Sequence, residues 1–376
     1  MAHRSGPTQS GQHLILVGGG HSHAIVLRHF VDHPPPDTRI TLIGREPLTP
    51  YSGMLPGFLA GHYSAEEMHI DLRALCRRAN VRFVHDEVIA LDLARRVVRG
   101  RKEEAAYDVL SINIGATPDC RSTPGAEIYA TPVKPISQFV MRWRALFDRM
   151  ANVMRLRLGV VGAGAGGVEL ILAAHHALAS VKPGAQFHLF ASERGLLPNH
   201  PHGVRRRLES TLRRRGIYLH QARVYAVTEN SVCTEQGAVT LDEVLWATSA
   251  AAQPWMAAAG FVTDSAGFIR TDATLQSTSH KHVFAAGDCA HVAAFPRQKA
   301  GVFAVRQGPP LAHNLTRALA GQAPKRFTPQ RKFLTLISTG DKSAVASRGG
   351  RLVLEGAWIW RWKDWIDRRF MAQFER

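Results

Sequence analysis

Short apolar runs alternate with helical patterns from the start of the chain. Residues Leu14–Val17 form an apolar run that leads into three glycines, and a helical pattern continues to about His33. Pro34-Pro35-Pro36 interrupts this pattern before a second apolar run, Arg39–Ile43. An apolar run of strand length, a helix and a second apolar run predict a strand–helix–strand unit with parallel strands.

The same pattern occurs again near the middle of the chain. Leu158–Val161 leads into a second glycine cluster and a helix, and Gln186–Phe190 is the next apolar run. A helix from about Val133 to Met150 links the two regions, and Asp108–Ile114 and Val283–Ala286 have the pattern of further strands. The alternation predicts an α/β fold with two Rossmann-like dinucleotide-binding domains, the second inserted into the first, and a small C-terminal α+β region. The expected boundaries are residues 12–132 and 256–322 for the first domain, 151–255 for the inserted domain and 323–376 for the C-terminal region.

The C-terminal region ends in a tryptophan-rich helical pattern. On a helical projection the large apolar residues are expected on one side, with charged residues elsewhere: Trp358, Ile359, Trp362, Trp365, Ile366 and Phe370. Such a helix is typical of a membrane surface, of a dimer interface or of docking on the protein's own core. Docking is the commonest of the three, while the density of tryptophan favours the membrane surface.

Composition and charge exclude several classes of protein. The chain has 376 residues, 45% of them hydrophobic, and a formal net charge of +17. The densest basic runs, Arg205–Arg207 and Arg213–Arg215, flank the apolar pair Leu208 and Leu212, so we expect the solvated face of one helix. No aromatic residues interleave with these arginines, which argues against nucleic-acid binding. There is no apolar run of transmembrane length, and the polar segment Met1–Gln12 does not have the pattern of a secretion signal, which predicts a cytoplasmic location.

Cysteine and histidine spacing excludes other kinds of site. The four cysteines, Cys76, Cys120, Cys233 and Cys289, form no C-x-x-C, so we expect neither a redox disulfide nor a zinc site. Cys120 and Cys289 each follow a turn that could face a cofactor, although buried thiols are the simpler interpretation. The paired histidines lack helical spacing with a nearby acid, so no metal site is expected.

The two glycine clusters carry the chemistry. Glycines that follow a strand and open a helix let the backbone approach a pyrophosphate and direct the helix N-terminus at it. The second cluster is a complete G-x-G-x-x-G formed by Gly162, Gly164 and Gly167, whereas the first has His23 in place of its third glycine. The strand after the second cluster ends Ala191-Ser192-Glu193-Arg194 without the usual ribose-binding acid. Both NADH and NADPH therefore remain open, since Ser192 and Arg194 could accept a 2′-phosphate.

Two glycine clusters followed by Gly287-Asp288, in this order, resemble the two-dinucleotide flavoproteins: the pyridine nucleotide–disulfide oxidoreductases, including type II NADH dehydrogenases. The resemblance implies FAD at the first cluster, NAD(P)H at the second, and a catalytic role for Glu169, which lies near the nicotinamide and flavin rings in relatives. For Glu169 alone, an acid in the first turn of a helix is also a simple dipole effect. The residues implied to bind FAD are Gly18, Gly20, His21, Ser22, Arg45, Glu46, Ser52, Gly53, Gly115, Ala116, Thr117, Gly287, Asp288, Lys299 and Ala300. Those implied to bind NAD(P)H are Gly162, Gly164 and Gly167.

Three segments resemble a particular branch, found fused ahead of selenophosphate synthetase. They are Val17–His23, Thr49–Gly57 and Trp362–Phe370, and because no synthetase domain follows Phe370 we expect the freestanding form. The implied activity is an FAD-dependent NAD(P)H oxidoreductase that passes hydride to FAD and then electrons to a quinone-like acceptor without a redox disulfide. Implied alternatives are a selenium- or sulfur-compound oxidoreductase and a redox-sensing flavin-binding protein. We also expect possible peripheral membrane contact through the C-terminal helix and a possible homodimer.

Overall fold

A computed structural model describes residues 11–150, 155–248, 250–330, 333–349 and 352–375. The chain divides into two compact units, which are described separately. The first unit comprises Met1–Thr49, Ile70–Ala116 and Ala252–Pro329, and the second comprises Pro50–His69, Thr117–Ala251 and Gln330–Arg376. Two of these junctions fall in the short strands β3 (Leu48–Pro50) and β4 (His69–Asp71). This division differs from the boundaries expected from the sequence, because residues 50–69 and the C-terminal region group with the second dinucleotide unit.

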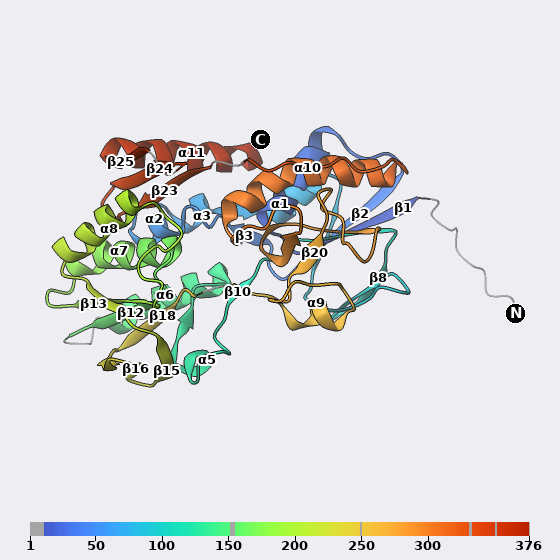
Figure 1. Cartoon of the computed structure of the whole chain (residues 1–376). Coiled ribbons are helices and arrows are strands. Elements are labelled where there is room, and N and C mark those ends of the chain that lie inside the picture. Colours follow the sequence, from blue (N-terminus) through green and yellow to red (C-terminus); the bar gives the residue numbers. More distant parts are fainter. Residues whose placement is uncertain (1–10, 151–154, 249, 331–332, 350–351, 376) are drawn as a thin grey trace, which may run out of the picture. The chain divides into compact units, whose positions relative to one another are not determined.

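The first unit is built on a parallel sheet of order β21-β9-β1-β2-β5 (Figure 1). The strands are β1 (Gln12–Val17), β2 (Thr38–Gly44), β5 (Arg82–His85), β9 (Val109–Ile112) and β21 (Val283–Ala285). The helices are α1 (His21–Asp32), α4 (Leu72–Arg78), α9 (Pro254–Ala258) and α10 (Gly301–Leu319), and a 3-10 turn, η1 (Gly287–Cys289), follows β21. Strand β1 has its successor β2 on one side and the later β9 on the other, so the strand order reverses beside β1. Ligands of open α/β sheets bind at the carboxyl edge beside such a reversal.

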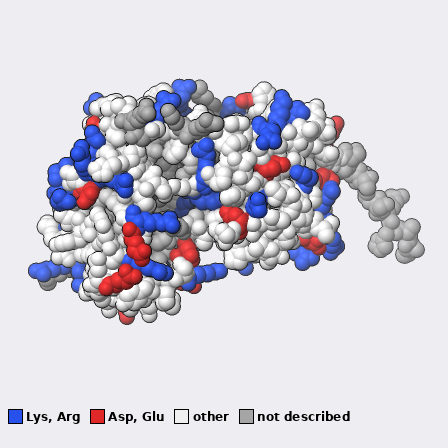
Figure 2. Space-filling model, in the orientation of Figure 1, with Lys and Arg blue, Asp and Glu red and all other residues white. Residues whose placement is uncertain are grey.

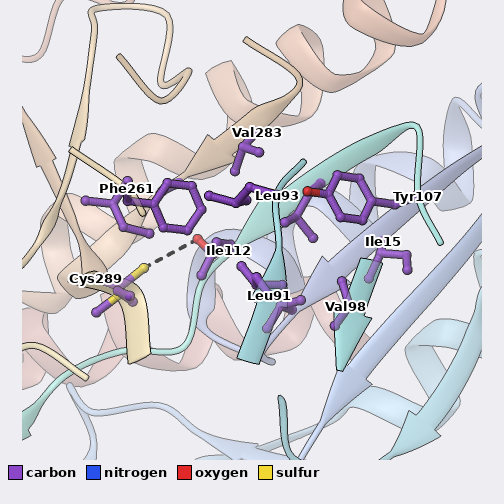
Figure 3. Packing of buried hydrophobic residues seen from close by; sticks show 14 of the residues in the cluster. Ile15, Leu91, Leu93, Val98, Tyr107, Ile112, Phe261, Val283 and Cys289 are labelled. Carbon is purple, nitrogen blue, oxygen red and sulfur yellow. Dashed lines mark hydrogen bonds between the residues drawn. The ribbon is translucent and has the colours of Figure 1, made fainter. Parts of the chain in front are cut away.

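Apolar residues on one face of this sheet pack against a small antiparallel sheet and α9. Figure 3 shows Ile15, Ile112 and Val283 together with Leu91 and Val98 from that small sheet. The accompanying strands are β6 (Val88–Asp92), β7 (Val97–Gly100), β8 (Glu104–Ala106), β20 (Ile269–Thr271) and β22 (Ala290–Val292). Helices α1 and α10 pack against each other. His23 of α1 bonds to Ser111 of β9. The side chain of Ser111 faces the side of the sheet opposite to its neighbours Leu110 and Ile112, which belong to the apolar cluster. Because β1 and β2 are parallel neighbours joined by α1, the βαβ unit predicted for Leu14–Ile43 is confirmed.

The second unit contains another parallel sheet, of order β11-β18-β12-β13-β14. Its strands are β11 (Thr131–Pro132), β12 (Arg157–Val161), β13 (Gln186–Ala191), β14 (Tyr218–Gln221) and β18 (Glu243–Trp246). Helix α7 (Ala165–Ala179) packs on β12 and β13. The remaining helices and strands are α2 (Leu55–Leu59), α3 (Ala65–Met68), α5 (Ala126–Tyr129), α6 (Ile136–Met150), α8 (His202–Arg214), β10 (Thr117–Pro118), β15 (Val224–Thr228), β16 (Ser231–Thr234), β17 (Gly237–Thr240) and β19 (Ala250–Ala251). The α/β fold class with two Rossmann-like sheets is confirmed.

The C-terminal segment folds as an antiparallel sheet and a long helix. Strands β23 (Leu334–Ser338), β24 (Ala344–Arg348) and β25 (Leu352–Gly356) are followed by α11 (Ala357–Glu375), which lies along them in Figure 1. The α+β character expected for this segment is confirmed. Among the described residues, no helix combines the length and the apolarity needed to span a membrane.

Helix α11 does not present its large apolar residues on one side, so that part of the sequence prediction is wrong. Its buried side chains follow one another at helical spacing and include two charged residues: Ile359, Lys363, Asp367, Met371 and Phe374. Three tryptophans face solvent, with Trp358 54% exposed, Trp362 40% exposed and Trp365 56% exposed. The prediction placed charged residues away from the buried side. Lys363 and Asp367 are nevertheless buried because they pair with each other.

The arginines of α8 are less solvated than the sequence predicts. Arg215 is only 16% exposed, its guanidinium lies 2.5 Å from the Asp341 carboxylate, and Arg207 pairs with Glu355. These contacts tie α8 to the C-terminal sheet. On the face shown in Figure 2, basic and acidic side chains are interspersed and do not form a stripe of one sign.

Candidate cofactor and nucleotide sites

The first glycine loop is held by its own backbone. Gly18 donates its N–H to Ile43 at 2.8 Å and Gly20 donates to Asn113 at 3.1 Å, so the loop is fixed to β2 and to the end of β9. Helix α1 begins at His21, and its first turn contains no acidic residue. The N-terminus of α1 therefore forms a site for an anion such as a pyrophosphate.

Asn113 connects three segments of this site, and the sequence analysis did not single it out. Its Nδ2 donates to the Ala286 carbonyl at 2.7 Å, and its Oδ1 accepts from the His23 N–H at 3.2 Å. A Cβ at Gly20 or Gly287 would overlap Asn113. These two glycines are thus required by protein packing, and the buried polar residue within the apolar end of β9 was the available signal.

His23 replaces the third glycine because its ring joins the loop to the sheet. The side chain is fully buried, with Nδ1 2.6 Å from the Gly18 carbonyl oxygen and Nε2 2.8 Å from the Ser111 hydroxyl. Burial lowers the pKa of His23 to about 4, so the ring is neutral. Ser22 is committed in a similar way, since its hydroxyl donates to the Ala304 carbonyl at 2.7 Å.

The other candidate residues of the first unit lie where its parallel strands end. Arg45 and Glu46 follow β2, Gly115 and Ala116 follow β9, and Gly287 and Asp288 follow β21. The Gly287 N–H donates to the Gln307 side chain at 2.6 Å, which ties η1 to α10. Lys299 packs its ammonium over the Phe268 ring and donates to the Ala290 carbonyl, and burial lowers its pKa. Helix α10 begins at Gly301, two residues later than the start expected near Lys299, and Ala300 is its N-cap residue.

These residues fit a dinucleotide such as FAD. Two helix N-termini without first-turn acids, those of α1 and α10, belong to this unit. Gly115 has a left-handed φ of +75° and open space where a Cβ would stand, which leaves room beside the strand end. Asp288 is buried in η1, the turn that follows β21.

The second glycine loop has a more open geometry. Gly162 donates to the Phe190 carbonyl at 3.0 Å. A Cβ at Gly162 would overlap the backbone of Ala247, and a Cβ at Gly167 would overlap the backbone of Gly162. At Gly164 and Gly166, in contrast, no atom lies within 4 Å of the position of a Cβ. Gly164 caps α7, whose first turn has no acidic residue. The loop therefore offers a free surface and a helix N-terminus to a second dinucleotide.

Glu169 lies in the second turn of α7, so the first-turn dipole interpretation is wrong. Helix α7 begins at Ala165 and its first turn contains no acid. The Glu169 Oε1 accepts the Ser338 N–H at 2.8 Å. Surrounding protein atoms remove the hydration of the carboxyl group and raise its pKa to about 7, against the opposing charge of Lys363. Part of the side-chain surface stays accessible, so this proton-holding group can meet a ligand.

A buried ion pair on α11 adjoins the segment that contains Ser52 and Gly53. Lys363 Nζ donates to Asp367 at 2.6 Å and to the Gly53 carbonyl at 2.7 Å. The Tyr51 hydroxyl also bonds to Asp367, and burial raises its pKa. The Tyr51 ring lies 4.5 Å from that of Phe370, between centroids.

A second set of polar contacts joins the same segments. Tyr63 donates its hydroxyl to Asp364 at 2.8 Å, and Arg368 bonds to Glu67 at 2.7 Å. Two of the three segments that carry the branch resemblance, Thr49–Gly57 and Trp362–Phe370, are therefore bonded to each other. Ser52, Gly53 and Thr117 belong to the second unit, with Gly162, Gly164, Gly167 and Glu169, whereas the other candidates belong to the first.

None of the cysteines forms a disulfide. Cys76, Cys120 and Cys289 are buried and Cys233 is partly buried, and all four are free. Cys289 donates to the Ile112 carbonyl, as Figure 3 shows, and burial raises its pKa to about 11. The absence of a redox disulfide stays a prediction from the sequence. Residues 1–10, most of the polar N-terminal segment, and Ser249 lie outside the described residues.

Comparisons with known proteins agree with this geometry. Residues 12–318 match the pyridine nucleotide-disulphide oxidoreductase family. The demethylphylloquinone reductase NdbB of Synechocystis is 24% identical over 329 residues, which cover 82% of this chain and 79% of that protein.

Two solved structures are similar across nearly the whole chain. The sulfide:quinone oxidoreductase of Aquifex aeolicus superimposes with a TM-score of 0.82 at 18% identity, covering 97% of this chain and 91% of its own. NDH2 of Plasmodium falciparum superimposes with a TM-score of 0.79 at 14% identity, covering 97% of both chains. At these identities the structures show a shared fold.

Proposed function

Because the chain belongs to the pyridine nucleotide-disulphide oxidoreductase family, and is thus an oxidoreductase that uses FAD and NAD(P)H, we propose that it transfers electrons from NAD(P)H to a quinone-type acceptor. FAD, when bound, supplies the chemistry by accepting a hydride and releasing its electrons to the acceptor. The observation that carries the proposal is the presence of two dinucleotide-binding edges, one in each unit, together with four free cysteines.

The first unit holds FAD in this proposal. The N–H groups at the start of α1, fixed by Gly18 and Gly20, bind the pyrophosphate, and Asp288 binds hydroxyl groups of the ribityl chain. Arg45 or Glu46 at the end of β2 borders the adenosine, and the space at Gly115 admits the cofactor close to the backbone. The N-terminus of α10 stabilises negative charge on the bound group.

The second unit holds the nicotinamide nucleotide. The open face at Gly164 and Gly166 accepts the pyrophosphate at the N-terminus of α7. Glu169, five residues after Gly164 on the same helix, then lies on the nucleotide side of this unit. Quinone reduction consumes two electrons and two protons, so a carboxyl group with a pKa of about 7 is suited to deliver a proton near neutral pH.

Two observations support a quinone as acceptor. The names of two similar proteins, a demethylphylloquinone reductase and a sulfide:quinone oxidoreductase, specify quinone chemistry for those proteins. In this chain the free cysteines leave no disulfide to relay electrons, so the acceptor must reach the flavin itself.

The exposed tryptophan face of α11 supports contact with a membrane surface, where quinones reside. Trp358, Trp362 and Trp365 face solvent beside Arg361 and Arg369. Tryptophan favours the membrane–water boundary, and nearby arginines gain on the order of 1 kcal/mol each next to an anionic leaflet. A peripheral site on the cytoplasmic leaflet follows from this proposal.

Stopped-flow spectroscopy tests the function directly. The FAD-loaded protein is reduced anaerobically with NADPH or NADH, and its reoxidation by a soluble quinone, a disulfide and a selenium compound is timed. We expect the quinone to reoxidise the flavin fastest. Reduction by selenide or sulfide without NAD(P)H would instead favour the selenium- or sulfur-compound oxidoreductase, and slow reoxidation by every acceptor would favour a redox sensor.

A further inference from the structure

We propose that the nucleotide substrate is NADPH, and that its 2′-phosphate is bound at the carboxyl end of β13 by Ser192, Arg194 and Arg223. This inference rests on the proposed function, because it concerns the nucleotide site of the second unit. Sequence alone left NADH and NADPH open; the sheet geometry adds the second arginine.

The end of β13 cannot bind a ribose in the manner of NAD-specific sheets. In those sheets a carboxylate at the end of the second strand accepts hydrogen bonds from the 2′-hydroxyl. Here β13 ends at Ala191, which is 1% exposed and carries only a methyl group. A carboxylate at this position would repel a 2′-phosphate, and its absence removes that repulsion.

A tight turn then brings Ser192 and Arg194 beside the nucleotide loop. Gly195 donates to the Ser192 carbonyl at 2.8 Å with a left-handed φ of +73°, which closes the turn. Two residues later, Leu197 donates to the Ala163 carbonyl at 2.9 Å, and Ala163 lies inside the second glycine loop. The turn is thus anchored at the edge where the adenosine end of the nucleotide is expected.

The neighbouring strand adds a second cation. Ala191 is paired with Gln221 of β14, and the pairing continues past the strand ends because Ala222 donates to the Ala191 carbonyl at 3.1 Å. Arg223 follows Ala222 two residues after β14 ends, just as Ser192 follows Ala191 after β13 ends, so the backbone pairing brings Arg223 to the same edge of the sheet as the Ser192–Gly195 turn. Sequence spacing does not reveal this, because Arg194 and Arg223 are far apart along the chain.

Both guanidinium groups are available to a ligand. Arg194 and Arg223 are exposed, and neither forms an ion pair with any residue that the structure describes. By contrast, Arg213 on α8 pairs with Glu209 and Arg215 pairs with Asp341. A phosphate monoester carries a charge of about −1.5 to −2 near pH 7 and binds planar guanidinium groups well.

One residue of the turn opposes this assignment. Glu193 is exposed between Ser192 and Arg194, and its carboxylate could instead accept hydrogen bonds from a 2′-hydroxyl. Against the single negative charge of Glu193 stand two arginines, so the net charge of the three side chains is +1. A substitution of Glu193 therefore belongs to the test of this subsite.

Two measurements test the subsite on the FAD-loaded protein. Calorimetry compares the affinities for 2′,5′-ADP and 5′-AMP, and stopped-flow reduction compares NADPH with NADH. We expect 2′,5′-ADP to bind at least about tenfold more tightly, with an affinity that falls as salt rises. Arg194→Ala and Arg223→Ala should each lower the NADPH:NADH preference about tenfold, and Ala191→Glu should reverse it.

Arg213→Ala is the matched control, because it removes an exposed arginine that already has a carboxylate partner, and it should leave the preference unchanged. The proposal is overturned if 5′-AMP and 2′,5′-ADP bind equally, or if NADH is preferred and Glu193→Gln abolishes that preference. Failure of the proposed function is a different result: the nucleotides bind with the expected discrimination, but neither one reduces the flavin.

Discussion

Gly164 and Gly20 occupy similar positions in the two glycine loops, but their missing side chains face different surroundings. A Cβ at Gly20 would overlap Asn113, whereas a Cβ at Gly164 would meet no atom within 4 Å. The sequence predicts that valine at either position blocks a pyrophosphate. In the structure, valine at Gly164 would block a pyrophosphate without disturbing the protein. Valine at Gly20 would instead displace Asn113 and the end of β9.

We therefore expect Gly164→Val to fold, to keep FAD and to lose flavin reduction by NAD(P)H. The valine side chain would occupy the open surface where the nucleotide phosphates bind, while the first unit is untouched. Absorbance of the bound flavin and stopped-flow reduction measure the two effects. Ser180→Val, at an exposed position at the opposite end of α7, serves as the control. Unchanged nucleotide affinity in Gly164→Val would show that the second loop is not the nucleotide site.

Glu169→Gln should change how stability depends on pH. The folded-state pKa of Glu169 is about 7, above the ordinary 4.5, so the folded protein holds this proton over a range in which the unfolded chain releases it. The contribution of Glu169 to the free energy of unfolding is therefore fully present below pH 4.5 and is lost as the pH rises through 7. The loss amounts to at most about 3 kcal/mol. Glutamine cannot ionise, so the melting temperature of the variant should fall less between pH 5 and pH 8 than that of the parent protein.

The same substitution should slow acceptor reduction at neutral pH and flatten its pH profile around 7, if Glu169 delivers a proton. Glu209→Gln on the exposed face of α8 is a control for both measurements, since Glu209 is 46% exposed. Parallel pH profiles for Glu169→Gln and the parent protein would contradict the assigned role.

At the scale of elements, α11 has a buried face and an exposed face that carries three tryptophans. Its inward face buries Ile359, Met371 and Phe374 with the Lys363–Asp367 pair, so removal of the helix after Gly356 would expose apolar surface and leave polar groups without partners. Truncation is for that reason a poor test of membrane binding. We expect truncation after Gly356 to destabilise the second unit.

Substitution of the three exposed tryptophans is the sharper test. We expect the triple change Trp358→Ser, Trp362→Ser and Trp365→Ser to abolish sedimentation with anionic liposomes while FAD content and melting temperature stay near the parent values. The reason is that these side chains are at least 40% exposed and contribute little to the core. Tyr218→Ser with Tyr225→Ser, two exposed aromatic residues of the same unit, is the control. Loss of a dimer in the triple variant, with no liposome binding by the parent, would indicate a protein interface.

At the scale of the whole molecule, the proposed electron transfer proceeds without cysteine. We expect the variant with all four cysteines changed to serine to keep its turnover per bound flavin, because none of the thiols is paired. Its melting temperature should fall, because serine at Cys289 replaces a sulfur atom that packs in the fully buried apolar cluster of the first unit with a smaller oxygen atom. Turnover and FAD content are measured on the same samples. Loss of flavin reoxidation with FAD retained would restore a redox role for cysteine.

The order of apolar runs and glycine clusters was sufficient to predict the fold class and the position of both loops. Strand-to-helix transitions are local features, set by side-chain periodicity and by the glycines between them, so they are visible in the chain itself. The βαβ unit after Leu14, the glycine loop before α7 and the Gly287-Asp288 turn all lie where the sequence places them. Family membership follows from the same order of motifs.

Only the tertiary structure decided which polar groups share an environment. Asn113 joins three segments of the first site, and Glu169 loses its hydration beside Ser338 and Lys363. The pairing of β13 with β14 brings the segments that carry Arg194 and Arg223 to the same edge of the sheet. The inward direction of Lys363 and Asp367 likewise depends on their partners in another segment. Burial and pairing arise from residues distant in sequence, so periodicity in one segment does not determine them.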